Sequence, residues 1–353
     1  MSRSDSVRVL VAGLGTMGLG HALAYHENPG FEIVCLLDRS DVVLPPVLSH
    51  YPLRRAFAAA LDELRPELVS INTYSDSHAD YAVMAIEAGA HVFVEKPLAT
   101  TLADAERVVA AARANDRKLV VGYILRHHPS WMRLIAEARA LGGPYVFRMN
   151  LNQQSSGPSW ATHKQLMKTT APIVDCGVHY LDAMCQITDA RPVEVRGMGL
   201  RLSDEIAPDM YNYGHLQVLF DDGSVGWYEA GWGPMMSETA FFVKDVISPN
   251  GSVSIVMDND ARSDDVDTHT RTGVIRLHRA ETDAEGRFVR ADELLSMQGE
   301  PDHQGLCDLE QAFVLSAIRQ DIDLARHMDD AVTSLRICLA ADESVRSQKA
   351  VRL

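Results

Sequence analysis

Cysteine is scarce in this chain of 353 residues, and its spacing excludes several kinds of site. The five cysteines are odd in number and scattered, with no Cys-x-x-Cys pair. A zinc knuckle or a redox dithiol needs closely spaced pairs, so we expect neither. Free thiols in a reducing, cytoplasmic environment are the plain interpretation. The cysteines are Cys35, Cys176, Cys185, Cys307 and Cys338.

Long apolar runs and a surplus of positive charge are also missing. No stretch approaches the ~20 apolar residues that span a bilayer. Met1–Ser6 leads directly into a short apolar strand, without the apolar core of a signal peptide. Lys plus Arg number 33 against 48 Asp plus Glu, and the net charge of −15 repels phosphate backbones and anionic lipid. We therefore expect neither a membrane nor a nucleic acid as partner.

The composition that remains is that of an ordinary globular protein. Apolar residues make up 46% and charged residues 23%, which excludes a mostly disordered chain. A length of 353 residues exceeds what one hydrophobic core usually supports, so we expect two domains, residues 1–123 and 124–353.

Residues 7–122 alternate short β-branched runs with segments of helical period, which is typical of βαβ units and a parallel sheet. The sequence therefore predicts an α/β fold. The second crossover is irregular, because Pro45-Pro46 leaves little room for a full helix. The predicted strands are Val7–Ala12, Phe31–Leu37, Leu68–Asn72, His91–Val94 and Lys118–Gly122, and the predicted helices lie near Met17–Tyr25, His78–Ala88 and Leu102–Asn115.

After residue 123 longer strands joined by turns predict a mostly antiparallel sheet, with an Asn-Gly hairpin signal at Asn250-Gly251. Aspartates crowd residues 258–267, but their spacing lacks the central Gly and terminal Glu of a calcium loop, so a solvated loop is the interpretation. The predicted strands are Tyr145–Leu151, Val193–Leu202, His215–Asp221, Val225–Gly231, Phe241–Ile247, Ser252–Met257 and Val274–Arg279, followed by helices near Gln304–Arg319 and Ala331–Ser347.

A glycine-rich turn joins the first predicted strand to the first predicted helix. Gly13-Leu14-Gly15-Thr16-Met17-Gly18 has the spacing and the context of a dinucleotide-binding fingerprint. Its glycines allow close backbone approach, and the helix amino end offers N–H groups to a pyrophosphate. A turn that serves only packing is the alternative.

Asp38 ends the second predicted strand, twenty residues after Gly18. An acidic side chain there accepts hydrogen bonds from the adenosine ribose and disfavours a 2′-phosphate, which favours NAD. Arg39 follows and is able to hold a 2′-phosphate or stack on adenine, so NADP stays possible. Asp38 as a solvated turn residue is the third interpretation.

Glu95-Lys96-Pro97 follows the apolar run His91–Val94 and precedes a helix entry at which Thr101 and Asp104 have capping-box spacing. Lys96 therefore falls at the carboxyl end of a predicted strand, where open α/β sheets bind ligands. A lysine at that position can contact a substrate hydroxyl during hydride transfer to a nicotinamide.

A second candidate site lies in a predicted helix that begins at Pro172. Spacings of four and three residues place Asp175, His179 and Asp182 on one helix face. A carboxylate one turn from an imidazole orients it and stabilises its charged form, as acid/base catalysis requires. Ordinary surface pairing is one alternative. A metal site is the other, but it lacks a further His or Cys cluster, so we expect no metal.

These motifs together resemble the glucose–fructose oxidoreductase/inositol dehydrogenase/rhizopine-catabolism (Gfo/Idh/MocA) family over nearly the whole chain. Besides the glycine fingerprint and Glu95-Lys96-Pro97, the Asp175-x-Gly177-x-His179-x-x-Asp182 pattern carries the resemblance. Two further segments support it, Thr73–His78, where the family has Thr-Pro-Asn-x-x-His, and Gly122–Pro129, which is similar to its Gly-Phe-x-x-Arg-x-x-Pro stretch.

The resemblance implies an NAD(P)-dependent dehydrogenase of sugars, cyclitols or related polyols. It implies an N-terminal Rossmann domain and a C-terminal α/β domain whose large open sheet forms a homodimer or homotetramer. Lys96 and His179 match the catalytic positions, with Asp175 as the carboxylate neighbour. The expected cofactor-binding residues are Gly13, Gly15, Thr16, Met17, Gly18, Asp38, Arg39, Thr73, Tyr74, Ser75, His78, Glu95 and Lys96.

The chain departs from the family pattern where the substrate pocket is shaped. Trp160-Ala161 and Thr169–Pro172 replace a Trp-Arg pair and a Gly-rich run, and Tyr74 replaces a proline. No known member's substrate is therefore carried over. The expected substrate-binding residues are Lys96, Tyr123, Arg126, Trp160, His163, Asp175 and His179, although packing or an internal ion pair of Arg126 would also explain some of them.

Oxidation of a secondary alcohol needs a base for the hydroxyl proton and a donor to its oxygen. Unperturbed pKa values of about 6.5 for His and about 10.4 for Lys favour His179 as the base and Lys96 as the donor. Burial beside the positive nicotinamide would lower the pKa of Lys96, so the reverse assignment stays open. NAD-dependent glycoside cleavage and a non-catalytic ligand-sensing role are the alternative functions.

Overall fold

The computed structural model describes residues 6–238, 242–257 and 272–353. The crowded aspartates, Asp258, Asp260, Asp264, Asp265 and Asp267, lie outside the described residues, as do most of Met1–Ser6 and the first residue of the predicted strand Phe241–Ile247. The chain groups into two compact units, one formed by Met1–Ile124 with Gln304–Val332 and the other by Leu125–His303 with Thr333–Leu353.

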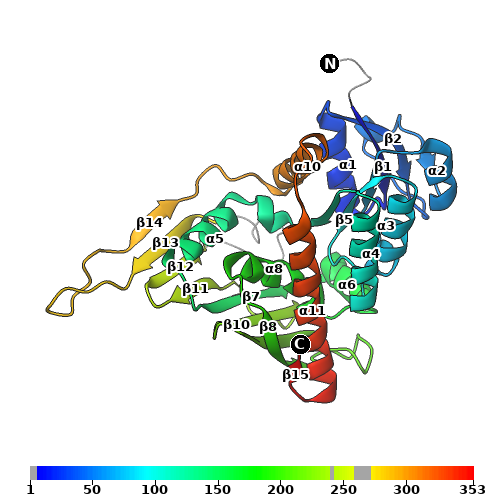
Figure 1. The fold of residues 1–353 in the computed structure, drawn as a ribbon. Helices are drawn as coiled ribbons and strands as arrows, with labels where there is room; N and C mark the ends of the chain where they lie inside the picture. Colours follow the sequence, from blue (N-terminus) through cyan, green and yellow to red (C-terminus); the bar gives the residue numbers. More distant parts are fainter. Residues whose placement is uncertain (1–5, 239–241, 258–271) are drawn as a thin grey trace. The chain divides into compact units, whose positions relative to one another are not determined.

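The first unit is built on a six-stranded parallel sheet, of which β1, β2 and β5 are labelled in Figure 1. The strand order is β3-β2-β1-β4-β5-β6. This confirms the predicted dinucleotide-binding α/β fold. All four positions of β4 and of β6 are buried, which explains why their residues are Leu, Val and Ile apart from Ser70 and Gly122. The strands are β1 (Val7–Ala12), β2 (Phe31–Leu37), β3 (Leu53–Arg54), β4 (Leu68–Ile71), β5 (His91–Glu95) and β6 (Leu119–Gly122).

Helices of this unit largely match the prediction. Thr101 caps the helix that follows β5, because its Oγ1 accepts the Asp104 N–H at 3.1 Å, as the capping-box spacing predicted. Pro45-Pro46 confines the next residues to a 3₁₀ turn, Pro46–Leu48, but a short helix, α2, still forms after it. The helices are α1 (Thr16–Glu27), α2 (Phe57–Leu64), α3 (His78–Glu87), α4 (Leu102–Ala114) and α10 (His303–Arg319), and the other 3₁₀ turns are Ser75–Ser77 and Ile124–His127.

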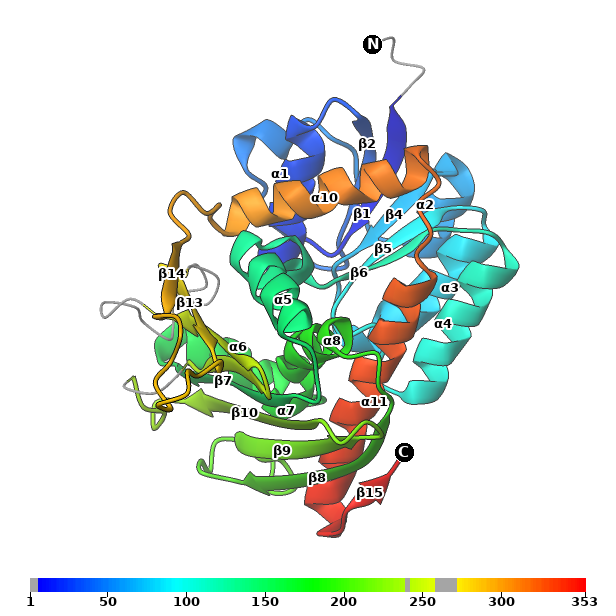
Figure 2. The same cartoon turned by 60° about the vertical axis from the view of Figure 1, so that its left-hand side comes forward.

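A segment from late in the sequence completes the core of the first unit. Val314 and Ala317 of α10 are buried in one cluster with Tyr25 and Phe31, and Figure 2 shows α10 beside α1. The expected division assigned all of 124–353 to the second domain, whereas Gln304–Val332 group with the first sheet. Helical periodicity revealed that α10 has an apolar face but not which partner that face covers.

The second unit is built on a nine-stranded mixed sheet in the order β14-β13-β12-β11-β7-β10-β9-β8-β15. Only β7 and β10 pair in parallel among the pairs of this described sheet, so the mostly antiparallel prediction is confirmed. The strands are β7 (Val146–Gln154), β8 (Pro192–Leu200), β9 (Tyr213–Phe220), β10 (Val225–Gly233), β11 (Lys244–Ser248), β12 (Gly251–Val256), β13 (Val274–Arg279), β14 (Glu293–Ser296) and β15 (Val351–Arg352).

Helices cover one face of this sheet (Figure 2), where α5 contacts β12 and α8 contacts β10. Gly226 of β10 accommodates this packing, because a Cβ there would lie 2.8 Å from Met184 Sδ of α8. The sequence-based prediction missed α5, α6, β14 and β15. The helices are α5 (Pro129–Leu141), α6 (Gly157–Leu166), α7 (Pro172–Asp175), α8 (Gly177–Ile187) and α11 (Ala325–Ser347), the last of which belongs to both units.

Among the described residues, no helix is both long enough and apolar enough to cross a bilayer.

Candidate functional site

Three loops that the sequence links to cofactor binding leave the six-stranded sheet at the same edge. The glycine turn follows β1, the segment 73–77 follows β4, and Lys96 follows β5. Because these strands are parallel neighbours, their carboxyl ends lie together, at the edge where open α/β sheets bind ligands. From β1 the chain adds β2 and β3 on one side and β4, β5 and β6 on the other. The carboxyl ends of β1 and β4 therefore form the topological switch point.

The glycine turn has the shape that a phosphate-binding backbone requires. Gly13 has a φ of +87°, and a Cβ there would lie 2.5 Å from the Asn72 carbonyl oxygen. A Cβ on Gly18 would lie 1.9 Å from the Gly13 oxygen. Apart from Gly15 and its two chain neighbours, no described residue comes within 4 Å of where a Gly15 Cβ would be, so this side of the turn is open.

The amino end of α1 is available to an anion. Among the described side chains none caps it, and Gly15 at the N-cap position leaves the first N–H groups of the helix for a ligand. Gly15 and Thr16 are exposed and Met17 is half-exposed. The open glycine turn and the uncapped helix end fit a pyrophosphate group.

Asp38 joins the glycine turn to the end of β2. Its Oδ2 accepts the Leu14 N–H at 2.8 Å and its Oδ1 accepts the Ser40 N–H at 2.9 Å. Each carboxylate oxygen has a further lone pair, so Asp38 can still accept from a ribose hydroxyl. Arg39 is exposed, and its carbonyl oxygen accepts from Arg55 at 3.3 Å.

The loop after β4 presents Thr73, Tyr74 and Ser75. Thr73 Oγ1 lies 2.7 Å from Ser77 Oγ, which orders the start of the loop. Tyr74 is 57% exposed, so its ring lies on the surface where the family has proline. Ser75 is half-exposed and opens the 3₁₀ turn that leads into α3.

His78 is buried and bonds to the backbone at the start of this loop. It is 1% exposed, and its Nδ1 lies 2.8 Å from the Pro97 carbonyl oxygen while its Nε2 lies 2.9 Å from the Thr73 carbonyl oxygen. Burial lowers the pKa of His78, opposed by these two carbonyls, so the neutral ring donates to one of them. His78 therefore acts on the cofactor edge through the backbone of Thr73 and Pro97.

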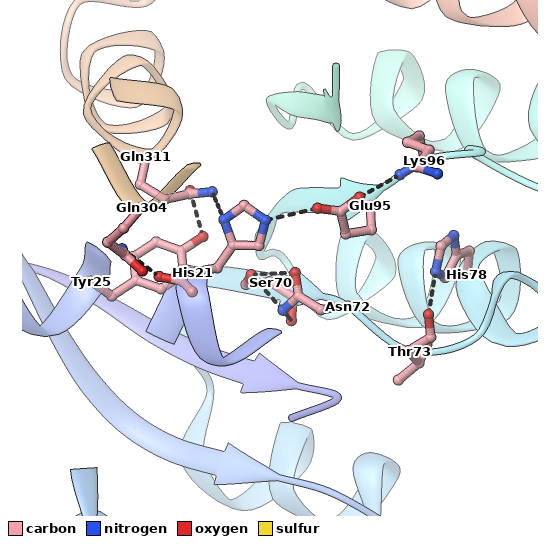
Figure 3. A network of polar contacts seen from close by, with 11 residues as sticks. His21, Tyr25, Ser70, Asn72, Thr73, His78, Glu95, Lys96, Gln304 and Gln311 are labelled. Carbon is pink, nitrogen blue, oxygen red and sulfur yellow. Dashed lines mark hydrogen bonds and ion pairs between the residues drawn. The ribbon is translucent and has the colours of Figure 1, made fainter. Parts of the chain in front are cut away.

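Glu95 and Lys96 form the end of β5 (Figure 3). Glu95 is 6% exposed; its Oε1 lies 2.8 Å from His21 Nε2, and its Oε2 accepts the backbone N–H of Lys96 at 3.1 Å. Lys96 is half-exposed, and its peptide bond to Pro97 is cis. The sequence-based prediction missed His21, although its position three residues after Gly18 places it on the buried side of α1.

In the second unit the predicted Asp–His helix is divided between α7 and α8, which meet at Cys176. Cys176 keeps a right-handed helical conformation, with φ −84° and ψ −35°, so the four-residue spacing of Asp175 and His179 is close to one helical turn. Asp175 is buried, whereas His179 is half-exposed.

Asp182, the third acidic or basic residue of the predicted helix face, has a different role. It is fully buried, and its two carboxylate oxygens accept from Arg126 Nε at 2.9 Å and Nη2 at 2.6 Å. Asp182 therefore belongs to an internal ion pair, with a partner that the shared helix face of Asp175, His179 and Asp182 did not predict. Arg126, which was expected to bind substrate, thus forms the internal ion pair that was considered as the alternative.

Tyr123 and Trp160, two other expected substrate-binding residues, are buried. Tyr123 at the end of β6 is 1% exposed, with its ring 6.3 Å from that of His327. Trp160 on α6 is 6% exposed and donates from Nε1 to Glu205 at 3.1 Å. Each of these two contacts joins residues of one unit.

His163 belongs to a polar and aromatic cluster at the ends of β7 and β10. Its ring stacks on Trp232 at 4.4 Å with an interplanar angle of 7°, and its Nδ1 lies 2.9 Å from Ser155 Oγ. Trp232 donates from Nε1 to Gln153 Oε1 at 2.7 Å, and Cys176 Sγ lies 3.9 Å from the same oxygen. Gln153 and Trp232 were missed, because only strand register brings them together.

Lys244 of β11 is a further residue that the sequence did not single out. It is 1% exposed, and its Nζ donates to the Asn150 carbonyl oxygen. The Nζ atom lies 4.4 Å from the ring centre of Tyr180 on α8 and 3.7 Å from that of Phe242. Burial lowers the pKa of Lys244 well below its ordinary value. Across the described ranges, no group of three His, Cys, Asp or Glu side chains is arranged to hold a metal ion.

Two family models match the chain. Residues 7–123 match the GFO_IDH_MocA model, described as an oxidoreductase family with an NAD-binding Rossmann fold. Residues 131–243 match the GFO/IDH/MocA C-terminal domain. The two matched ranges contain the glycine turn, Lys96, Asp175 and His179.

Named relatives with similar sequences include inositol dehydrogenases. The chain is 29% identical over 219 residues to inositol 2-dehydrogenase from Acidothermus cellulolyticus, which covers 60% of this chain and 62% of that protein, less than two thirds of its length. It is 26% identical over 265 residues to scyllo-inositol 2-dehydrogenase (NAD(+)) from Bacillus subtilis, over 70% of this chain and 73% of that protein.

Solved structures show the same fold. The oxidoreductase domain protein from Kribbella flavida superimposes with a TM-score of 0.80 at 20% identity, over 99% of both chains. At this identity the likeness shows the fold alone, and it covers both units.

Proposed function

Because the chain belongs to the Gfo/Idh/MocA oxidoreductase family, we propose that it transfers a hydride between a nicotinamide cofactor and a secondary hydroxyl or ketone of a sugar, cyclitol or related polyol. The observation that carries this proposal is Lys96 at the carboxyl end of β5, on the sheet edge that also bears the glycine turn. A nicotinamide bound at this edge supplies the hydride acceptor.

NAD is the proposed cofactor. Asp38 is fixed by two backbone N–H groups and keeps lone pairs for ribose hydroxyls, while its negative charge disfavours a 2′-phosphate. Arg39 is exposed beside it and supports some use of NADP. We expect kcat/KM to be higher for NAD, and Asp38→Ser to raise the NADP/NAD ratio of kcat/KM by about tenfold or more. An unchanged ratio would contradict this role of Asp38.

In the proposed reaction the side chains of the protein supply a proton acceptor and a cation. We propose that His179 accepts the hydroxyl proton and that Asp175, one helical turn away, orients the ring and stabilises its charged form. Lys96 donates to the same substrate oxygen and stabilises the negative charge that develops on it. The half-exposure of both Lys96 and His179 leaves each side chain accessible to a substrate.

Substitution of the two groups tests the proposal. Lys96→Met and His179→Ala should each reduce turnover by about 10²-fold or more, with the Kd of the dinucleotide little changed. Lys349→Met and His50→Ala are matched controls, because both side chains are exposed. Substrates would be a panel of sugars and inositols, scored by NADH and NADPH absorbance. Near-normal turnover of both active-site variants would refute the assignment.

The same panel separates the proposal from other functions. Release of a free sugar from a glycoside without net NADH would indicate glycoside cleavage through transient oxidation. Tight dinucleotide binding without turnover of any polyol would indicate a ligand-sensing protein. Net NADH formation with at least one polyol supports the dehydrogenase.

We also propose that the sheet face opposite α5 and α8 binds a second copy of the chain. Ile247, Val146, Val225 and Leu219 lie in register across β11, β7, β10 and β9, so they share one face, and each is between 36% and 43% exposed. Such a continuous apolar row on a sheet is typical of an interface rather than of a solvated surface.

The mass in solution tests this interface. Val225→Arg should lower the sedimentation mass from that of a dimer or tetramer to a smaller species, whereas Met132→Arg, exposed on α5, should not. A monomeric wild type, or an unchanged mass for Val225→Arg, would contradict the proposal.

A further inference from the structure

A buried chain of hydrogen bonds runs from α1 and α10 to the peptide of Lys96 (Figure 3). We infer that His21 and Gln311 are positioning residues that hold Glu95, and through it the Lys96 backbone, in one orientation. The inference deepens the proposed function and rests on it for the role of Lys96. Neither His21 nor Gln311 belongs to the glycine fingerprint or to the Glu95-Lys96-Pro97 motif.

The contacts form an unbroken series inside the first unit. The Tyr25 hydroxyl lies 2.7 Å from Gln311 Oε1, and Gln311 Nε2 lies 2.9 Å from His21 Nδ1. His21 Nε2 lies 2.8 Å from Glu95 Oε1, and Glu95 Oε2 accepts the Lys96 N–H at 3.1 Å. The first four side chains are between 0% and 6% exposed, so water does not compete for these bonds.

The donors and acceptors permit one direction along the series. Burial raises the pKa of Tyr25 above its ordinary value, so its hydroxyl keeps its proton and donates to the Gln311 oxygen. The Gln311 amide then presents its N–H to His21 Nδ1, which must be the unprotonated ring nitrogen. The proton of His21 is therefore on Nε2, where it is donated to Glu95.

The series leaves Glu95 little freedom. Its two oxygens accept from different partners, as expected of a carboxylate held at both ends. Gly122 of β6 packs against it, because a Cβ there would lie 3.2 Å from the Glu95 carboxyl carbon. His21 itself packs edge-on against Phe93 of β5 at 4.7 Å. Loss of the His21 donor would remove one of the hydrogen bonds that fix the Glu95 carboxylate and would weaken its hold on the Lys96 N–H.

Hydrogen exchange at the Lys96 amide tests the inference without a substrate. His21→Leu and Gln311→Met should each accelerate exchange of this amide by about tenfold or more, since its acceptor is no longer fixed. Gln304→Met is the matched control: it lies on the same helix, α10, and bonds to the Gly20 carbonyl oxygen at 3.0 Å, but it does not join the series. Equal exchange in all variants would overturn the inference.

A second variant keeps the test decisive if a substitution disturbs folding. Gln311→Leu removes the N–H donor with a side chain of similar size, so it should accelerate exchange as Gln311→Met does. Protection of the β1 and β4 amides at wild-type level would show that the unit is folded. Normal Lys96 protection in a folded Gln311→Leu protein would overturn the inference.

Kinetics then separates positioning from packing. His21→Leu should reduce kcat by about tenfold or more, because the reacting group is misplaced. The KM for the dinucleotide should change by less than about threefold, because the binding contacts of the cofactor are kept. His21→Gln, which keeps an N–H donor, should recover part of kcat. If the wild type oxidises no polyol, the proposed function fails, while the exchange experiment still decides the positioning role. A fall in dinucleotide affinity with normal kcat would overturn that role.

Discussion

Glu310 is a buried carboxyl group that should lower the stability of the protein at neutral pH. It lies on α10 and is 1% exposed, and among the described residues neither of its oxygens has a hydrogen-bond partner. Burial raises the pKa of Glu310 well above its ordinary value, and the nearby charge of Glu95 raises it further. At a pH between the pKa values of the unfolded and folded states, the folded protein therefore holds a proton on Glu310 that the unfolded chain releases.

The sign of the pH dependence follows from this difference. Below a pH of about 4.3 the carboxyl is protonated in both states, so it adds no pH-dependent cost. Above that pH, folding must take up a proton, and the cost grows by about 1.4 kcal/mol per pH unit until the folded-state pKa is reached. A neutral carboxyl without a partner adds about 1–3 kcal/mol of desolvation at every pH.

Glu310→Met removes both costs and keeps a side chain of similar length. We expect the free energy of unfolding to rise by about 1–3 kcal/mol at pH 4.5 and by more at pH 7, measured by urea denaturation at the two pH values. Glu87→Met is the control, because Glu87 is exposed on α3 and should change the free energy by less than about 0.5 kcal/mol. A less stable Glu310→Met protein, or a gain that does not grow with pH, would refute the reasoning.

Three further predictions concern Asp182, Gly18 and His127. Asp182→Ala removes the buried carboxylate that accepts two hydrogen bonds from Arg126 and should cost about 3–5 kcal/mol in urea denaturation, so a loss under about 1 kcal/mol would count against a structural ion pair. Gly18→Ala places a Cβ 1.9 Å from the Gly13 oxygen and should raise the Kd of NAD by about tenfold or more in a fluorescence titration; an unchanged Kd would show that the turn is not the binding site. Burial lowers the pKa of His127 to about 4, so its contribution to stability is present above a pH of about 6.5 and is lost as the pH falls towards 4. His127→Gln should therefore reduce the fall in the free energy of unfolding between about pH 6.5 and pH 4. An unchanged fall would contradict this prediction.

Much of the fold could be predicted because its signals are local. β1 and β2 were predicted with the bounds that the structure has. Apolar, β-branched runs that end at a glycine or an aspartate can be recognised as strands without tertiary information. α2 and β3 were missed because Pro45-Pro46 dominated the interpretation of that crossover. α5 was missed as well, although Trp131, Leu134 and Ala138 recur at helical spacing, because its residues were interpreted only through the Arg126–Pro129 motif.

The candidate site shows the same division. Lys96 and the glycines could be identified because a motif at the end of a parallel strand has a fixed place in such a sheet. The partner of Asp182 could not be predicted, because helical spacing gives the face of a residue but not the side chain that meets it. Whether His78 contacts a ligand or holds the backbone likewise depends on two carbonyls distant in sequence.

The sequence by itself determined the α/β class, the parallel sheet with its glycine turn, and the position of Lys96 at a strand end, because propensity, turn chemistry and strand period act over a few neighbouring residues. Only the tertiary structure decided that Gln304–Val332 complete the first unit, and that Gln311, 290 residues after His21, completes the series of bonds that ends at Lys96. Contacts between segments so far apart depend on how whole helices pack, and no local pattern encodes that choice.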